Sequence, residues 1–234
     1  IKTNKFSNKI EGQILSYEKN LNYFKARNII KRQLKKNKVK IFYNKKFNKK
    51  LIKDYDKIIV ATYDQNNTVI NSLGLKIKNN YKYELVEKII IKLPKKYKNI
   101  SCMVIDGKFV CLDPYIGTKY HLLSDVKNSK LEVLENKYPK FKNRNKKYLN
   151  SGIVKNIKIS KFKNFIKHGS LYLPFLKNSK YIGSFFVTRV IKIHKEKTDE
   201  RLNEITKVNK KIISIFSGKW NTCIGIAKNL ENII

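Results

Sequence analysis

The stretch DKIIVATYD (residues 56–64) indicates the fold class of this chain. Four apolar residues follow one another, Ile58-Ile59-Val60-Ala61, and the run stops abruptly at polar residues. A continuous apolar run, unlike an alternating one, is typical of a strand covered on both faces, as in a parallel sheet. We therefore expect residues 56–64 to supply a buried strand of an α/β unit.

The residues before this strand favour the same interpretation. Between residues 22 and 37, apolar side chains recur at spacings of three and four with lysines between them. This spacing predicts an amphipathic helix with one buried stripe. The segment VKIFY (39–43) follows as a predicted short strand. The residues of the buried stripe would be Tyr23, Ala26, Ile30 and Leu34.

The end of the chain also leads from a strand into a helix. KIISIF (211–216) is the last predicted strand, and IFSGKWNTCIGIAKNL (215–230) places Gly218 and polar residues at the start of the helix. Bare backbone N–H groups at such a start attract anions. The simpler alternative is that Gly218 makes a turn and Asn221 caps the helix. One face of this helix would carry Trp220, Ile224, Ala227 and either Leu230 or Glu231.

From about residue 76 the sequence is typical of an antiparallel sheet, with β-branched and aromatic runs separated by Pro, Gly and Asp turns. Asp106-Gly107 is the strongest hairpin signal. Counting outward from it pairs Cys102 with Cys111, although we expect free thiols. Helices are predicted across 129–149 and 160–173. The predicted strands are YELVEKIIIKLP (83–94), SCMVI (101–105), KFVCLDP (108–114), KYHLLSDV (119–126) and YIGSFFVTRVIKI (181–193).

The charge of the chain raises a second hypothesis. It has 53 Lys+Arg against 17 Asp+Glu, a net charge of +36, as in a basic nucleic-acid-binding protein of the ribosomal type. However, the excess is mostly lysine spread along the whole chain, together with many Asn, Ile and Tyr, which favours compositional bias. The aromatic residues also sit mostly within apolar strands instead of forming a stacking surface. A nucleic-acid partner is therefore the less favoured alternative.

Two further features concern the compartment. No apolar run approaches the ~20 residues that a membrane span requires. Three cysteines without a secretory signal fit a reducing environment, so we expect a cytoplasmic protein.

Taken in order, these motifs resemble FAD-dependent oxidoreductases of the D-amino acid oxidase and glycine oxidase type, from about residue 20 onward. DKIIVATYD resembles the strand ending in an Ala-Thr-Gly-like turn beside the flavin nucleotide, with Tyr63 where the family often has glycine. YELVEKIIIKLP and GKFVCLDPYIGTKYHLL resemble the substrate-domain sheet. YIGSFFVTRVI followed by TDERL resembles the glycine-to-arginine strand and its sequel. SGKWNTCIGIAKNL resembles the closing glycine-to-helix element, whose amides approach the isoalloxazine ring.

The resemblance implies FAD as cofactor and oxidation of an amine- or hydroxyl-bearing carbon of a small substrate by hydride transfer to flavin. It implies an α/β plus α+β fold, with residues 1–75 and 196–234 in an incomplete Rossmann-like FAD-binding domain and 76–195 in an antiparallel-sheet substrate domain. The family's G-x-G-x-x-G turn has no counterpart here. We therefore expect that turn in an upstream segment, and an inactive fragment that binds FAD poorly by itself.

The resemblance also implies site residues. Those near the cofactor are Ala61, Thr62, Gly218, Lys219, Trp220, Asn221 and Thr222. Thr198 and Asp199 would lie in a loop that faces the cleft, or alternatively in an ordinary solvated loop. No catalytic residue or metal ligand is assigned, because the chain shows no Ser/His/Asp order, zinc spacing or paired carboxylates.

Three residues are candidates for binding substrate: Arg189, Tyr115 and His121. Arg189 lies on an apolar strand, where its planar fork could hold a substrate carboxylate or form a structural ion pair with Asp or Glu. For His121 the alternative is an ordinary packed strand residue. For Tyr115 it is a role in closing the turn after Pro114.

Overall fold

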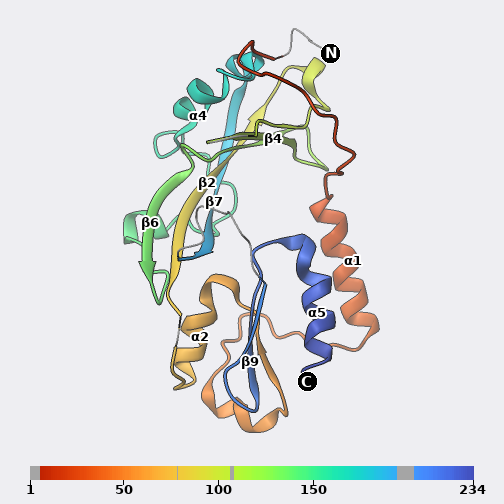
Figure 1. Ribbon diagram of the computed structural model, residues 1–234, viewed down its shortest axis with the longest axis vertical. Coiled ribbons are helices and arrows are strands. Elements are labelled where there is room, and N and C mark those ends of the chain that lie inside the picture. Colours follow the sequence, from red (N-terminus) through yellow and green to blue (C-terminus); the bar gives the residue numbers. More distant parts are fainter. Residues whose placement is uncertain (1–5, 78, 106–107, 194–202) are drawn as a thin grey trace. The chain divides into compact units, whose positions relative to one another are not determined.

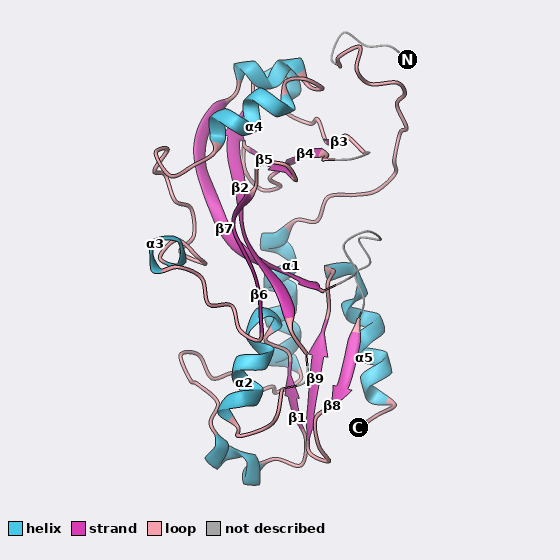
Figure 2. Cartoon of the chain, turned by 60° about the vertical axis from the view of Figure 1, so that its left-hand side comes forward, coloured by secondary structure: helices cyan, strands magenta, loops and turns pink. Residues whose placement is uncertain are grey.

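The computed structural model describes residues 6–77, 79–105, 108–193 and 203–234 (Figures 1 and 2). Its fold is mixed α/β with antiparallel sheets. The Asp106-Gly107 turn and the loop with Thr198 and Asp199 lie outside the described residues. The α-helices are α1 (Tyr23–Lys36), α2 (Asn66–Ser72), α3 (Asn143–Lys146), α4 (Phe162–Gly169) and α5 (Cys223–Glu231), and the strands are β1 (Ile58–Val60), β2 (Tyr81–Lys92), β3 (Cys102–Met103), β4 (Val110–Pro114), β5 (His121–Asp125), β6 (Lys130–Asn136), β7 (Lys180–Lys192), β8 (Glu204–Lys207) and β9 (Ile212–Phe216).

The chain divides into two compact units, each assembled from separate segments. The first unit comprises Ile1–Ile41, Val86–Leu131 and Lys146–Val187. The second unit comprises Phe42–Leu85, Glu132–Asn145 and Thr188–Ile234. The domain boundaries expected from the sequence stay a prediction.

The second unit contains a three-stranded sheet of order β1-β9-β8. β1 and β9 are parallel, with Ile58 opposite Ile212 and Val60 opposite Ser214, which confirms the parallel pairing expected for the apolar run. β8, which the sequence analysis missed, is antiparallel to β9. Ile58, Val60, Ile212 and Leu73 form a buried cluster, and Val69 of α2 packs against it.

The prediction that β1 is covered on both faces was wrong. Ile58 and Val60 are buried, whereas Ile59 between them is 42% exposed. β1 has three residues and lies at the edge of its sheet, and one of its faces packs into the apolar cluster. Ile59, on the other face, lines a cavity that is described below.

Strands β3, β4 and β5 of the first unit belong to an antiparallel sheet, as predicted. The sheet has the order β3-β4-β5-β2-β6, and β7 also pairs with β2. Ile89, Leu123, Leu112 and Cys102 form one row across four strands. Because Leu112, not Cys111, faces Cys102, the predicted Cys102–Cys111 pairing was wrong. All three cysteines are free thiols, as expected.

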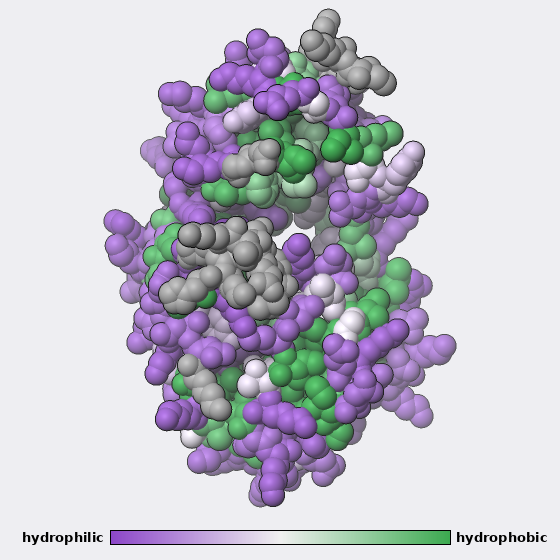
Figure 3. Space-filling model, in the orientation of Figure 1, coloured by the Kyte–Doolittle hydropathy of each residue, from purple (hydrophilic) through white to green (hydrophobic). Residues whose placement is uncertain are grey.

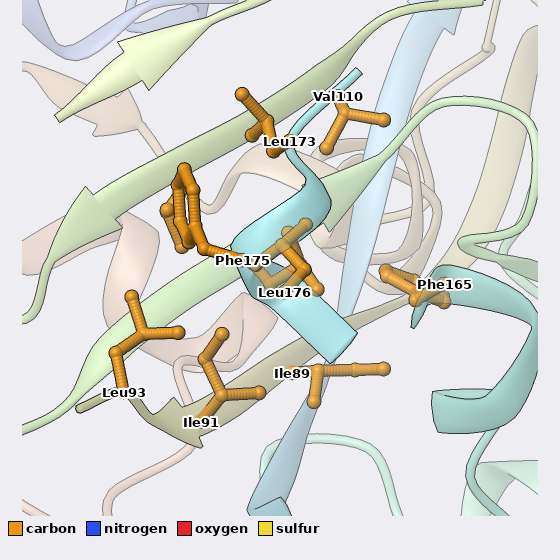
Figure 4. Packing of buried hydrophobic residues seen from close by; sticks show 10 residues of the cluster. Ile89, Ile91, Leu93, Val110, Phe165, Leu173, Phe175 and Leu176 are labelled. Carbon is orange, nitrogen blue, oxygen red and sulfur yellow. The ribbon is translucent and has the colours of Figure 1, made fainter. Parts of the chain in front are cut away.

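One face of this sheet carries the core of the first unit. Ile89 and Ile91 of β2 pack with Val110 of β4, and Phe165 of α4 covers them (Figure 4). These side chains are at most a few per cent exposed, and a fully buried side chain of this size stabilises a fold by about 1.5–3 kcal/mol. The helix predicted across 160–173 is confirmed in its first half by α4. The 3₁₀ turn η4 (Pro174–Asn178), with Phe175 and Leu176, completes the layer.

Two secondary-structure predictions were wrong. Residues 129–149 do not form one helix, because β6 occupies 130–136 and α3 only 143–146. Pro139 lies inside the predicted helix, where it lacks an N–H and clashes with the preceding turn. Residues 39–43 form no strand in the described structure, because no neighbouring strand pairs with them.

Both terminal helices form but bury different residues from those predicted. α1 spans nearly the predicted range, but none of its residues is buried. α5 buries Ile226 and Leu230, whereas Trp220 and Ile224 are 61% and 68% exposed. The spacing of apolar residues therefore predicted both helices correctly. It did not show which face of each helix packs against the rest of the chain.

Candidate functional site

A buried asparagine joins the ends of β1 and β9 in the second unit. The backbone N–H and the hydroxyl of Thr62 both donate to Asn66 Oδ1, at 2.7 and 3.0 Å. Asn66 Nδ2 donates to the carbonyl of Ile215 at 2.7 Å. Because the two parallel strands end at the same edge, this bridge fixes Thr62 beside the residues that lead into Gly218. Asn66 is 3% exposed, and the sequence analysis missed it.

Tyr63, which stands where the resembled family often has glycine, adopts a backbone conformation that glycine tolerates best. Its φ is +55°, in the left-handed region that side chains rarely occupy. The ring stacks on Phe216 with centroids 5.9 Å apart, and its hydroxyl accepts a hydrogen bond from the Val190 N–H at 3.0 Å. These contacts hold the strained turn after Thr62 in place.

A cavity of about 510 Å³ lies along β1 and is lined by all three residues of that strand. Ile59 lines it, which accounts for the exposure of that residue, and Thr62 lines it at the end of the strand. Lysine ammonium groups and hydroxyls can bind phosphate, while aromatic and aliphatic side chains can pack on a heterocycle. Ala61 is exposed and is not a lining residue. The other lining residues are Lys45, Lys46, Phe47, Tyr55, Lys57, Ile58, Val60, Thr68, Val69 and Ser72.

The terminal turn leads from β9 into α5 through a short 3₁₀ segment, η5 (Trp220–Thr222). Gly218 and Thr222 are half-buried, whereas Lys219, Trp220 and Asn221 are exposed. None of these residues lines the cavity along β1. A role of residues 218–222 in cofactor binding therefore stays a prediction.

The N-cap of α5 is Thr222, so the alternative that Asn221 caps this helix was wrong. The Thr222 hydroxyl lies within hydrogen-bonding distance of Lys219 O, Asn203 Oδ1 and Ser217 Oγ, at 2.8, 2.9 and 3.0 Å. Within the described residues, no side chain caps the amides of the first turn of α5.

Arg189 forms an ion pair inside the second unit. Its Nε and Nη2 atoms lie 2.6 and 2.5 Å from Glu84 Oε2, and the Glu84 side chain is fully buried. This is the arrangement expected for the structural ion-pair alternative. Binding of substrate by Arg189 stays a prediction.

Tyr115 and His121 lie at opposite ends of the turn between β4 and β5 in the first unit. The Tyr115 N–H donates to Tyr120 O, and its carbonyl accepts from the Thr118 hydroxyl at 2.7 Å, so this residue does close the turn. Its ring contacts Phe24 and Phe185.

His121 is 2% exposed, beside the core of the first unit. Burial lowers the pKa of His121 and outweighs the opposing effects of the Tyr97 and Lys98 backbone and of Asp113. A neutral, enclosed imidazole agrees with the alternative of a packed strand residue. Substrate binding by Tyr115 or His121 stays a prediction.

Two buried carboxylates of the first unit were missed by the sequence analysis. Glu87 accepts hydrogen bonds from the hydroxyls of Ser160 and Ser184, both at 2.5 Å, and from the Lys161 N–H at the start of α4. Asp125 Oδ2 lies 2.9 Å from His168 Nδ1. The His168 ring also lies edge-on to the ring of Tyr172, with centroids 5.7 Å apart.

The half-buried thiols of Cys102 and Cys111 are poor nucleophiles. Burial, followed by a hydrogen bond to Asp113, raises the pKa of Cys111 to about 12. Burial likewise raises the pKa of Cys102 to about 12. Both therefore remain protonated near neutral pH.

Comparisons with known proteins give little further information. No family model matches the chain, and no curated protein matches it. Among the solved structures that match, glycine oxidase from Geobacillus kaustophilus resembles the chain with a TM-score of 0.42 and 10% identity over 71% of this chain. The chain covers 37% of the length of that protein, and a likeness of this degree carries no argument about activity. None of the described helices is both long and apolar enough to cross a membrane.

Proposed function

We propose that this chain is part of an FAD-dependent oxidoreductase of the D-amino acid oxidase and glycine oxidase type. Its support is the ordered set of motifs together with one structural observation, which is the cavity beside Thr62. The parallel strand β1 ends at Val60, and the Asn66 bridge fixes Thr62, two residues further on, against β9. In α/β sheets, ligands bind outside the carboxyl ends of parallel strands.

The residues around the cavity fit the adenosine and phosphate part of FAD. Lys45, Lys46 and Lys57 supply positive charge for phosphate, and Tyr55 and Ile59 supply apolar surface for the adenine ring. The N–H and hydroxyl of Thr62 already donate to Asn66, so the role of Thr62 is to end the strand and shape the cavity.

In the full-length protein, FAD would accept a hydride from an amine- or hydroxyl-bearing carbon of a small substrate. The residues of this chain would contribute binding and orientation. The cavity along β1 would hold the nucleotide, and the amides that begin α5 would face negative charge on the cofactor, as the resemblance implies.

The test is a titration of the 234-residue chain with FAD, followed by flavin fluorescence. We expect weak binding, with a Kd on the order of 100 µM or weaker, because the family's G-x-G-x-x-G turn is absent from these residues. Ile59→Trp should weaken it at least several-fold, because the indole would fill the cavity. Ile224→Trp is the matched control, since Ile224 is also exposed but does not line the cavity.

Two outcomes would contradict the proposal. One is FAD binding that Ile59→Trp leaves unchanged. The other is undetectable FAD binding combined with micromolar binding of RNA, which would favour the nucleic-acid alternative.

A further inference from the structure

Helix α1 exposes an apolar stripe on the first unit. The stripe consists of Tyr23, Ala26, Ile29, Ile30 and Leu34, which fall on one side of the helix at 100° per residue. Tyr23, Ile29 and Ile30 are 50%, 49% and 45% exposed. The neighbouring residues 14–21 expose further large apolar side chains, including Ile14 at 88% and Leu15 at 83%. The apolar surface therefore continues beyond the helix.

The rest of α1 is cationic. Residues 19–41 contain nine lysines and arginines and no Asp or Glu. Two of the chain's five arginines, Arg27 and Arg32, lie in this helix. A hollow of about 660 Å³ lies where the two faces meet, lined by Ile29 and Asn28 together with Lys25, Lys31 and Arg32.

The contacts of α1 leave Tyr23, Ile29 and Ile30 of this stripe exposed, whereas Ala26 and Leu34 are half-buried. Phe24 contacts the Tyr115 ring at 5.9 Å and packs near Gly117. Ile29 and Ile30 point roughly 120–140° away from Phe24 around the helix axis. The basic helix α4 makes the contrast clear, because its apolar residue Phe165 is fully buried in the core. Hydrophilic residues dominate the visible face of the molecule, with apolar residues exposed between them (Figure 3).

We propose that α1 docks the protein on an anionic phospholipid surface. Its apolar stripe would enter the bilayer interface, and its cations would contact the phosphate and carboxylate groups of the lipid heads. An amphipathic helix with one apolar side and a Lys/Arg-rich polar side is the form that lies in a membrane interface. Nucleic acid would use the cations but leave the exposed isoleucines without a role. A lipid surface uses both faces of the helix.

The experiment is co-sedimentation of the 234-residue chain with two kinds of vesicle. One is pure phosphatidylcholine, and the other contains about one third phosphatidylserine. We expect the chain to pellet with the anionic vesicles only, and binding to weaken as salt is raised, since salt screens the headgroup charge. Ile29→Gln/Ile30→Gln should bind at least about tenfold more weakly, because both side chains lose their apolar surface.

The variant keeps the helix intact, because Gln is a good helix former and neither isoleucine is buried. A circular dichroism spectrum checks this. The matched control is Ile157→Gln/Leu171→Gln, which removes two apolar side chains of similar exposure from elsewhere in the first unit. It should bind like the unmodified chain.

Each of the following results would overturn the proposal. The chain fails to bind anionic vesicles, or the double isoleucine variant binds them as well as the unmodified chain does. Sedimentation velocity shows a dimer that the isoleucine variant abolishes, in which case a second copy covers the stripe. Double-stranded RNA binds tightly while vesicles do not, in which case the cations serve nucleic acid.

Discussion

At the residue scale, His121 gives a prediction about pH. Burial lowers its folded-state pKa below the ordinary value of 6.5. Below pH 6.5 the unfolded chain takes up a proton that the folded chain resists, so stability is complete above this pH and is lost as pH falls toward the folded pKa. We expect the unfolding free energy to drop between pH 7 and pH 5, by at most about 1.4 kcal/mol per pH unit from this one group.

The measurement is urea unfolding of the unmodified chain and of His121→Leu across this pH range. The leucine has no proton to gain, so the variant should have a shallower pH dependence whatever its absolute stability. Parallel pH profiles for the two proteins would show that the imidazole is not held neutral by the fold.

The residue scale also shows how far the sequence could identify the candidate site. Thr62 was named through the resemblance of DKIIVATYD to the family's strand, and it lines a cavity, while cofactor binding by Thr62 stays a prediction. Asn66 was missed, because an asparagine six residues after a strand looks like an ordinary helix-start residue until β9 is placed beside it. Glu84 was likewise not identifiable as the partner of Arg189, because 105 residues separate them. Pairings over such distances are set by topology and not by local spacing.

At the element scale, the local sequence pattern was enough to predict a strand or helix wherever the periodicity of its apolar residues determines how it packs. β2, β4, β5 and β7 were predicted because long β-branched runs are bounded by turns. β6 was taken for helix, because Lys130–Asn136 becomes a strand by pairing with β2, a tertiary effect. The buried face of α5 was misjudged for a similar reason. The spacing of apolar residues shows that a helix has an apolar face, but the neighbouring elements determine which face of the helix is buried.

Gly183 of β7 supports a prediction at this scale. A Cβ there would lie 2.5 Å from Ile153 Cγ2 and 3.2 Å from the carbonyl of Val154, where the chain forms an isolated bridge to β7. Gly183→Ala should therefore destabilise the chain by about 1–3 kcal/mol through overpacking. Denaturant unfolding measures this change.

Gly225 in α5 is the matched control. A Cβ at this position would meet no atom within 4 Å. Gly225→Ala should stabilise the chain by about 0.5–1 kcal/mol, because alanine favours a helix more than glycine does. Both alanine variants could instead change stability in the same direction. Position 183 would then not require glycine because of the close approach of β7 to Val154.

At the scale of the whole molecule, the prediction concerns the net charge of +36. Even if each of the 17 acidic residues paired with one cation, 53 minus 17 leaves 36 cations without an acidic partner. The unfolded chain spreads these charges over a larger volume than the folded chain, so their repulsion opposes folding. Salt shortens the range of that repulsion, from roughly 20 Å at 0.02 M to about 6 Å at 0.3 M. We expect the thermal midpoint to rise by several degrees over this range, measured by differential scanning fluorimetry.

The choice of salt separates screening from other salt effects. Sodium and potassium chloride at equal ionic strength should raise the midpoint equally, because screening depends on ionic strength and not on the identity of the cation. An uncharged osmolyte at matched osmolality should raise it much less at these concentrations. A midpoint that stays flat or falls with salt would mean that the lysines are spaced widely enough for their repulsion to cost the fold little. The compositional bias that enriched lysine would then have been accommodated on the surface without a stability cost.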